Sequence, residues 1–440
     1  MSGPGTRRLV RERLKPIGNG ARAALGALAL LAVSGCVVRE TKPLPKVNPV
    51  QATHEIPADE QLQVCVHPLD PGLPAVLDAK TLDKKRISPD IRKAESVYFA
   101  TLLRTTLESS GQWGDAWVAP DSVQFVDVVV TGRILESTGE RLALEITAKD
   151  STGRVWINAK RYESPADEGS YKSEAALKLR DPFQNLYSQI SNDMVSAREA
   201  LTLAERRTIR RVTLLEFDRD LAPQAMGGYL GKDAKGLVKV LRLPATDDPI
   251  ALRAERIRQS DVAVIETVDG YYTSFSEQMS ESYGQWRRAS DEEIEKEQRA
   301  LTQARTRTYL GAVAVLASLL VPNQCGPNYT CLRMQSMVRY GAAISGTAAF
   351  ISGLKKYADA KVHAQTLKEM SETFQSEVAP QVVDVEGRTL KLSGTAEEQY
   401  REWRKLLRDL YLEENGTAVR VAPTPESVTP PVPVAADAAH

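Results

Sequence analysis

Cysteine has the clearest chemistry in this 440-residue sequence, because its four cysteines occur in distinct settings. The first, Cys36, ends the stretch Leu30–Cys36, in which an apolar run and two small residues precede the thiol. This is the pattern that a lipoprotein signal peptidase reads, so we expect cleavage before Cys36 and acylation of its sulfur. Several acyl chains would hold the protein firmly at a bilayer, since each buried methylene contributes about 0.8 kcal/mol.

The residues before Cys36 have the composition of an export signal. Six Arg and Lys side chains between positions 7 and 22 give a positive start, and the apolar run Ala23–Val33 follows. That run is too short for a membrane span, which needs about twenty residues. We predict a signal peptide over 1–35 and a lipidated, proline-bearing tether over 36–60. Val37 is not the acidic residue associated with inner-membrane retention, so we expect a lipid-anchored, periplasm-facing protein of the outer membrane.

The other three cysteines have structural interpretations. Cys325 and Cys331 flank a polar turn, and in an oxidising periplasm we expect them to form a small-loop disulfide. Cys65 alternates with Val64 and Val66 in an expected strand, where a buried and inert thiol is the simplest interpretation.

Motifs for other chemistry do not occur in the sequence. It has four histidines and no His-Glu-x-x-His pair, Cys-x-x-Cys pair or Gly-x-Ser-x-Gly elbow. A glycine-rich stretch includes Gly231-Lys232, but Asp233 stands where a phosphate loop needs Ser or Thr. Basic and acidic residues balance at 57 each, which gives no net field toward nucleic acid. We therefore predict no catalytic residues, no metal and no cofactor, in a protein that is not an enzyme.

One alternative is a site that forms only in the folded chain. A pocket converging on His67, Asp70 and Tyr98 would indicate a periplasmic ligand-binding protein or a hydrolase. A lone histidine at a strand end, such as His67, is more often structural or solvated.

Residues 61–165 have the pattern of a small α/β domain. Alternating apolar residues predict strands over 61–67, 125–136, 141–150 and 154–162. A helix is predicted from Ser88-Pro89-Asp90 to about Ser110, with Ser88 as its cap and Gly111 after its end. One helix packed on a mostly antiparallel sheet places the domain in the α+β class.

Three parts of this domain resemble the small α/β domains of curli-secretion lipoproteins, flagellar outer-membrane accessory proteins and the N-terminal part of TolB. They are the helix Arg92–Tyr98, the segment Ser110–Gly114, and the strand pair through Val128–Gly132 and Asp150–Trp156. The resemblance covers about a quarter of the chain and implies a fold, and it does not transfer a function.

From Asp181 the pattern becomes mainly α-helical, and we predict a helical region over 181–377. One long amphipathic helix is expected over 182–211, and another begins at Asp247-Asp248-Pro249. Val262–Val268 fits either a strand or a helix. Ser290–Glu293 is expected to cap a separate charged helix that continues through Arg307.

Two apolar runs, Tyr309–Val321 and Tyr340–Leu354, predict a Gly/Ala-rich helical hairpin over 309–354. Small residues recur on one face of each run, and such ridges let two helix backbones approach closely. The predicted contact ridge consists of Gly311, Ala314, Ser318, Gly341, Ser345, Ala349 and Gly353.

Two interpretations of this hairpin remain open. In the first, it dips into the membrane or packs against copies of itself. In the second, it is an antiparallel pair buried in the protein's own helical region. Its length favours burial, because each run is shorter than a membrane span, whereas its glycine content and all-round apolarity favour lipid or a partner.

The end of the chain is predicted as a β-hairpin plus a C-terminal helix over 380–415, followed by a disordered Pro-rich tail over 416–440. Thr395 and Glu398 form a capping box, and an apolar stripe with Tyr400 and Trp403 is expected to pack in a core. We thus expect a structural or assembly component of an envelope or secretion complex. Its partners would be the membrane, through the lipid and in one interpretation the hairpin, and envelope proteins or further copies of itself. No nucleic acid is expected.

Overall fold

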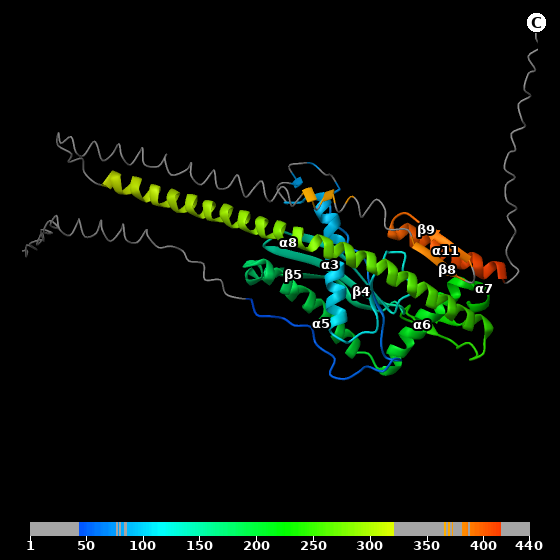
Figure 1. Ribbon diagram of the computed structural model, residues 1–440. Coiled ribbons are helices and arrows are strands. Elements are labelled where there is room, and N and C mark those ends of the chain that lie inside the picture. The colour runs from blue at the N-terminus through cyan, green and yellow to red at the C-terminus, as the bar shows by residue number, and fades with distance from the viewer. Residues whose placement is uncertain are drawn as a thin grey trace, which may run out of the picture. The chain divides into compact units, whose positions relative to one another are not determined.

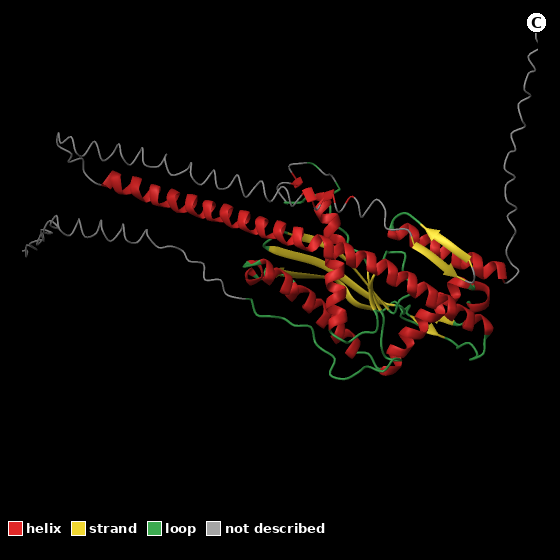
Figure 2. Cartoon of the chain, in the orientation of Figure 1, coloured by secondary structure: helices red, strands yellow, loops and turns green. Residues whose placement is uncertain are grey.

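The computed structural model describes residues 44–75, 78, 81–82, 86–320, 365–366, 368–369, 372, 381–385 and 388–414. Side chains of helix α8 are described as far as Lys296, apart from residue 293. The α+β class is confirmed: helices pack around a five-stranded sheet (Figures 1 and 2).

The sheet has the strand order β2-β1-β3-β4-β5 and is mixed. Strand β1 (Val64–Val66) pairs in parallel with both β2 (Ala116–Val118) and β3 (Val128–Ser137). Strands β4 (Arg141–Asp150) and β5 (Val155–Pro165) continue it as an antiparallel meander. The expected antiparallel sheet is therefore wrong for its first three strands. Strand β2 has only three residues, too few to give a recognisable sequence pattern. The chain passes from β1 to β2 through a helix, and such a crossover makes the two strands parallel.

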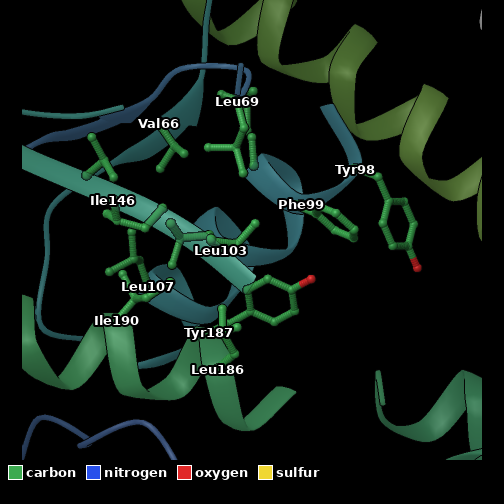
Figure 3. Packing of buried hydrophobic residues seen from close by; sticks show 14 of the residues in the cluster. Val66, Leu69, Tyr98, Phe99, Leu103, Leu107, Ile146, Leu186, Tyr187 and Ile190 are labelled. Carbon is green, nitrogen blue, oxygen red and sulfur yellow. The ribbon is translucent and has the colours of Figure 1, made fainter. Parts of the chain in front are cut away.

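That crossover is helix α3 (Pro89–Ser109), which begins and ends where the sequence predicts. Ser88 is its N-cap residue in an extended conformation, although its side chain makes no capping hydrogen bond. Pro89 occupies the first turn, where a missing N–H costs nothing. The helix buries Phe99, Leu103 and Leu107 against one face of the sheet (Figure 3).

The long helix predicted over 182–211 is wrong, because two helices occupy this range. Helix α5 (Gln184–Glu199) ends at Ala200, and helix α6 (Leu203–Leu221) begins after Thr202. Thr202 and Glu205 form a reciprocal capping box, in which each side chain satisfies a backbone N–H of the other. At Thr202 a new helix begins at the capping box, although the apolar periodicity continues across it.

Short elements connect these helices. They are the 3-10 turn η1 (Glu168–Tyr171), α4 (Glu174–Leu179) and α7 (Pro223–Met226), and the hairpin of β6 (Leu230–Lys232) and β7 (Val238–Val240). The glycine-rich stretch around Gly231 therefore belongs to a β-hairpin.

Helix α8 (Pro249–Leu320) has 72 residues and is about 108 Å long at 1.5 Å per residue. It starts at the predicted Pro249, and the ambiguous Val262–Val268 is helical. The separate helix predicted from Ser290 is wrong, because Ser290–Glu293 lies inside α8. A cap satisfies backbone N–H groups that have no partner in the first turn of a helix. Inside α8 the preceding turn already accepts hydrogen bonds from these N–H groups, so a capping sequence there does not start a new helix.

Two hydrophobic clusters flank the sheet, and α8 contributes to both. The first core cluster lies between the sheet, α3 and α5, and takes Val268, Phe275 and Met279 from α8. The second core cluster joins Cys65 and Trp117 to α6, α8 and the C-terminal helix. Helices from the predicted helical region thus share their cores with the strands of the predicted α/β domain.

The C-terminal elements agree with the sequence. Strands β8 (Gln381–Val385) and β9 (Arg388–Leu392) form the predicted antiparallel hairpin. Helix α11 (Ala396–Glu414) follows Thr395, whose side chain and that of Glu398 make the predicted capping box. Tyr400 and Trp403 are buried in the second core cluster, which confirms their packing role.

Candidate functional site

Most of the residues predicted to carry chemistry lie outside the described residues. These are Cys36, Cys325, Cys331, Gly341, Ser345, Ala349 and Gly353. Lipidation, the disulfide and the contact ridge therefore stay predictions. Gly311, Ala314 and Ser318 lie on the backbone of α8, within the single helix that also passes through both core clusters.

Cys65 is described, and its predicted burial is confirmed. The thiol is completely buried in the second core cluster. Burial raises the pKa of Cys65, and the nearby Asp269 carboxylate raises it further. A thiol in this setting stays protonated and is a poor nucleophile.

His67, Asp70 and Tyr98 are not brought together. His67 and Asp70 line a groove of about 880 Å³, whereas Tyr98 lines a different pocket of about 720 Å³. Val66 points into the first core cluster, so the next side chain, His67, points to the opposite face of the sheet. Tyr98 comes from α3, which covers the Val66 face, and in Figure 3 its ring lies apart from Val66.

The His67 ring lies between two acceptors. Its Nε2 is 3.1 Å from the carbonyl oxygen of Val123, and its Nδ1 is 3.3 Å from a carboxylate oxygen of Asp121. Burial lowers the pKa of His67, and Asp121 opposes that effect only in part. Ser122 in the same loop donates from its hydroxyl to Glu397 of α11 at 2.9 Å. These contacts fasten the loop after β2 to the start of the C-terminal helix.

The groove beside His67 lies on the sheet face that α3 and α5 leave open. Val129 and Thr131 of β3 and Lys149 of β4 form part of its floor, and Lys232 of the β6–β7 hairpin lies at its wall. The groove has a volume of about 880 Å³, and its lining is more polar than the two core clusters.

A second polar cluster is buried and was not found from the sequence. The carboxylate of Glu95 accepts hydrogen bonds from Tyr283 at 2.6 Å and from Ser137 at 2.7 Å, and it lies 3.3 Å from Arg92. Burial raises the pKa of Glu95, and Arg92 opposes this shift. Glu95 has no exposed surface, so it cannot reach a substrate. It joins α3, β3 and α8.

Arg287 continues this fastening of α8. Its guanidinium is 2% exposed and donates to Asp181 at 2.7 Å. The rings of Tyr98, Phe183 and Tyr283 surround it at 4.5 to 5.8 Å from its carbon to their centroids. A charge buried in this way requires both its acidic partner and its aromatic neighbours, so the register of α8 on the body is tightly specified.

Helix α5 holds the segment Pro45–Val50 through two asparagines. Asn185 accepts from the N–H of Val47 at 2.9 Å and donates to the carbonyl of Pro45 at 3.0 Å. Asn192 repeats the pattern, accepting from the N–H of Val50 at 2.7 Å and donating to the carbonyl of Asn48 at 3.1 Å.

Arg180 adds a bridge between the two partners. Its guanidinium donates to the carbonyl of Val47 at 3.2 Å and to the side-chain oxygen of Asn185 at 2.8 Å. We call Arg180, Asn185 and Asn192 the tether dock. Six residues of the predicted tether, Pro45–Val50, are therefore attached to α5. Asn185 and Asn192 lie on the same face of α5, because seven residues are about two helical turns apart.

The pocket of about 720 Å³ lies beside the tether dock. Its lining includes Lys46 and Pro49 of the docked segment, Leu177 and Leu179 of α4, and Arg287 at the body. The Leu179 side chain is 87% exposed, more than any other large apolar residue for which exposure is described. The docked segment thus forms one wall of a hollow on the surface of the body.

Among the described residues, no group of three or more His, Cys, Asp or Glu side chains could hold a metal ion. Over the same residues, no helix combines the length and the apolarity that a membrane span requires.

Comparison of the chain with protein-family models, with curated proteins and with solved structures gave no match. Its function is therefore argued from its own residues.

Proposed function

We propose that this chain is a non-enzymatic, lipid-anchored outer-membrane protein that acts as a structural or assembly component of an envelope complex. The lipid on Cys36 would be its anchor. The apolar hairpin over 309–354 would be its contact with the membrane or with further protein. The proposal is supported by the lipobox, by the attached tether and, above all, by helix α8.

The observation that carries the proposal is the continuity of α8. One unbroken helix runs from Pro249 through both core clusters and on to Leu320, so it contains the first apolar run from Tyr309. From Ile294, which is 6% exposed, the helix continues for 26 residues, or about 39 Å. A helix that is rooted in a core and continues into a small-residue ridge is suited to presenting that ridge at a fixed angle.

The root of α8 is fastened by polar contacts as well as by apolar ones. Asp269 accepts from the N–H of Val118 at 2.7 Å, at the edge of the sheet, and pairs with Arg104 of α3 at 2.7 Å. This contact also blocks the edge strand β2 from pairing with another chain. Tyr283 and Arg287 lie farther along α8 and make further polar contacts with Glu95 and Asp181. Helix α8 is thus attached to the body at three positions, so a force on its far end would be transmitted to the sheet.

Fractionation and crosslinking test the proposal. The wild-type chain should sediment with outer membranes, carry an acylated N-terminus by mass spectrometry, and crosslink to envelope proteins or to itself. Cys36→Ser, exported through a non-lipoprotein signal, should lose the acyl mass and should be released by an alkaline carbonate wash unless the hairpin inserts. Cys65→Ala, which changes a buried thiol and leaves the lipobox intact, serves as the matched control.

Deletion of 309–354 in the Cys36→Ser background separates the roles of the hairpin. Retention that depends on this segment would indicate membrane insertion, and full release with loss of crosslinks on deletion would indicate a protein contact. A wild-type chain that is free in the periplasm, unmodified and without crosslinks would overturn the proposal.

The groove beside His67 supports a second candidate, a periplasmic ligand-binding protein or hydrolase. Its polar floor and its volume of about 880 Å³ are in the range of small-molecule sites. Saturable binding of a small ligand that is lost in Lys149→Glu and kept in Lys178→Glu would favour it. Lys149 lines this groove, and Lys178 lines the other pocket.

A further inference from the structure

The tether dock recognises main-chain groups only. Each asparagine accepts one N–H and donates to one carbonyl two residues earlier, so no tether side chain takes part in these four hydrogen bonds. The spacing of the two asparagines on α5 matches the spacing of the two N–H groups on the tether. Asn185 and Asn192 are seven residues apart on a helix, or about 10.5 Å. The N–H groups of Val47 and Val50 are three residues apart, or about 9.3 Å in a polyproline II strand.

The prolines of the segment occur at positions whose backbone N–H is not needed for binding to the dock. Pro45 and Pro49 lack an N–H, and neither position has to donate one to the dock. Proline also favours the extended conformation that places Val47 and Val50 at the required distance. The sequence Pro45–Val50 is thus pre-organised for the face of α5 that it meets.

We propose that helix α5 carries a binding site for extended main chain, that its ligand is the chain's own segment Pro45–Val50, and that occupancy of this site sets how far the body can move from its lipid anchor. The last part rests on the lipidation of Cys36 proposed above. When the site is filled, nine residues, Cys36 to Leu44, separate the lipid anchor from the docked segment, and nine residues span at most about 30 Å.

Release of the segment would lengthen the connection. The next attachment along the chain is the N–H of Ala52, which donates to the carbonyl of Ser110 at 2.8 Å. Sixteen residues, Cys36 to Gln51, would then separate the lipid anchor from this attachment, and sixteen residues span at most about 55 Å. The dock therefore controls a difference in reach of up to about 25 Å.

The construction of the site suits an exchangeable contact. The dock hydrogen bonds of Val50 and Asn48 are exposed to solvent, and the Val50 side chain is 47% exposed. Farther along, Asp59 pairs with Arg207 and Glu60 pairs with Arg206 of α6, so the rest of the tether stays attached when Pro45–Val50 leaves. Opening is thus local and leaves both core clusters unchanged.

Hydrogen exchange tests the binding site without reference to lipid. In the full mature chain, the amides of Val47 and Val50 should be protected, and Asn185→Ala/Asn192→Ala should accelerate their exchange by about tenfold or more. Asn158→Ala, a change of an exposed asparagine in β5, is the matched control and should leave both amides protected. Equal exchange of Val47 and Val50 in the wild type and in the double variant would overturn the proposal.

Reach is tested with the tether itself as the variable. Val47→Pro/Val50→Pro removes both N–H donors and leaves the body unchanged. Lys46→Pro adds a proline at a position that does not donate to the asparagines, and it is the control. With lipidated protein on a supported bilayer of phosphatidylethanolamine and phosphatidylglycerol, neutron reflectometry should place the double-proline layer farther out, by up to about 25 Å.

The two failures are distinguishable. If mass spectrometry finds no acyl group on Cys36, the proposed function fails, while the exchange result for Val47 and Val50 still decides the binding site. If the protein is lipidated and the wild type and double-proline layers lie at the same height, the control of reach is wrong.

Discussion

The two ends of the described chain are attached to the body by different forces. The N-terminal segment Pro45–Val50 is held by hydrogen bonds at the surface, with its valine at position 50 half exposed. The C-terminal helix α11 is held by side chains that are almost completely buried, among them Trp403 and Leu407. Exposed hydrogen bonds exchange readily with water, whereas buried apolar surface does not, so the first attachment is local and the second is part of the fold.

The polar contacts of α11 reinforce this difference. Asp261 of α8 is buried and accepts from the indole of Trp403 at 3.0 Å and from the hydroxyl of Tyr400 at 3.1 Å. Arg404 lies between the rings of Phe125 and Phe217 at 4.9 and 4.6 Å and pairs with Asp220 of α6. Because Asp261, Tyr400, Trp403 and Arg404 are buried, water cannot replace a hydrogen-bond partner that one of them loses. Each of these contacts therefore stabilises one position of α11.

The largest effect should follow from truncating the centre of this contact. Trp403→Ala removes the largest fully buried side chain and leaves Asp261 without its indole donor. We expect a loss of about 3 to 5 kcal/mol in the free energy of unfolding, measured by urea denaturation. Leu412→Ala, at a position 42% exposed on the same helix, is the control and should cost less than about 1 kcal/mol. Similar losses for the two variants would mean that α11 is not part of the cooperative fold.

A somewhat smaller loss is expected when the acceptor is removed. Asp261→Ala leaves the hydroxyl of Tyr400 and the indole of Trp403 without their acceptor, whereas Arg404 keeps its pair with Asp220. The change should cost about 3 kcal/mol. Asp261→Asn keeps one acceptor oxygen and the volume of the side chain, so it should recover part of this stability. If Asp261→Asn were as damaging as Asp261→Ala, the negative charge beside Arg404 would matter more than the hydrogen bonds.

Much of the fold could be predicted from local signals. The start of α3 at Pro89, the strands β4 and β5, the hairpin of β8 and β9, and the capping box at Thr395 all follow from proline, alternation or capping residues. The failures occur where a signal depends on context. The capping box at Thr202 starts a helix and the one expected at Ser290 does not, because only at Thr202 has the preceding helix already ended.

The candidate sites were less accessible to sequence reasoning. Glu95 and Arg287 look like ordinary charged residues of amphipathic helices, and only the packing of α3 against α8 shows that they are buried. The tether dock joins residues about 140 positions apart, so neither partner indicates the other. Pairing across such distances is decided by tertiary structure. Composition indicated a proline-bearing tether over 36–60, and it could not show that the chain is attached to the body from Pro45 onward.

The stability of the body and the attachment of Pro45–Val50 should also respond differently to pH. Burial, together with Glu255 and Asp248 of the neighbouring segment, raises the pKa of Asp218 on α6 from 3.8 to about 7, and Arg258 opposes this shift only in part. The folded state then binds the proton more tightly than the unfolded chain does. The stabilisation is complete below pH of about 4 and is lost as the pH rises through about 7.

Asp218→Asn removes this dependence. We expect the variant to gain stability relative to the wild type between pH of about 4.5 and 8, measured by urea denaturation at both values. Exchange of the Val47 amide, corrected for its intrinsic rate, should not change in the same way, because the asparagine side chains of the dock do not titrate. A constant difference between variant and wild type across this range would show that Asp218 titrates normally.

The smallest change in global stability is expected at the tether dock. Asn185→Ala/Asn192→Ala removes the four hydrogen bonds to the tether and the one from Arg180 to Asn185, each worth about 0.5 to 1.5 kcal/mol. These losses are offset by the freedom that the released segment regains. Because the segment opens without unfolding either core, the free energy of global unfolding should fall by less than about 1 kcal/mol, measured by urea denaturation beside Asn158→Ala. A loss as large as that of Trp403→Ala would place the tether in the cooperative fold, and the anchor would then be held at a fixed short distance. A small loss with fast exchange at Val47 instead makes the length of the connection an adjustable property of the protein.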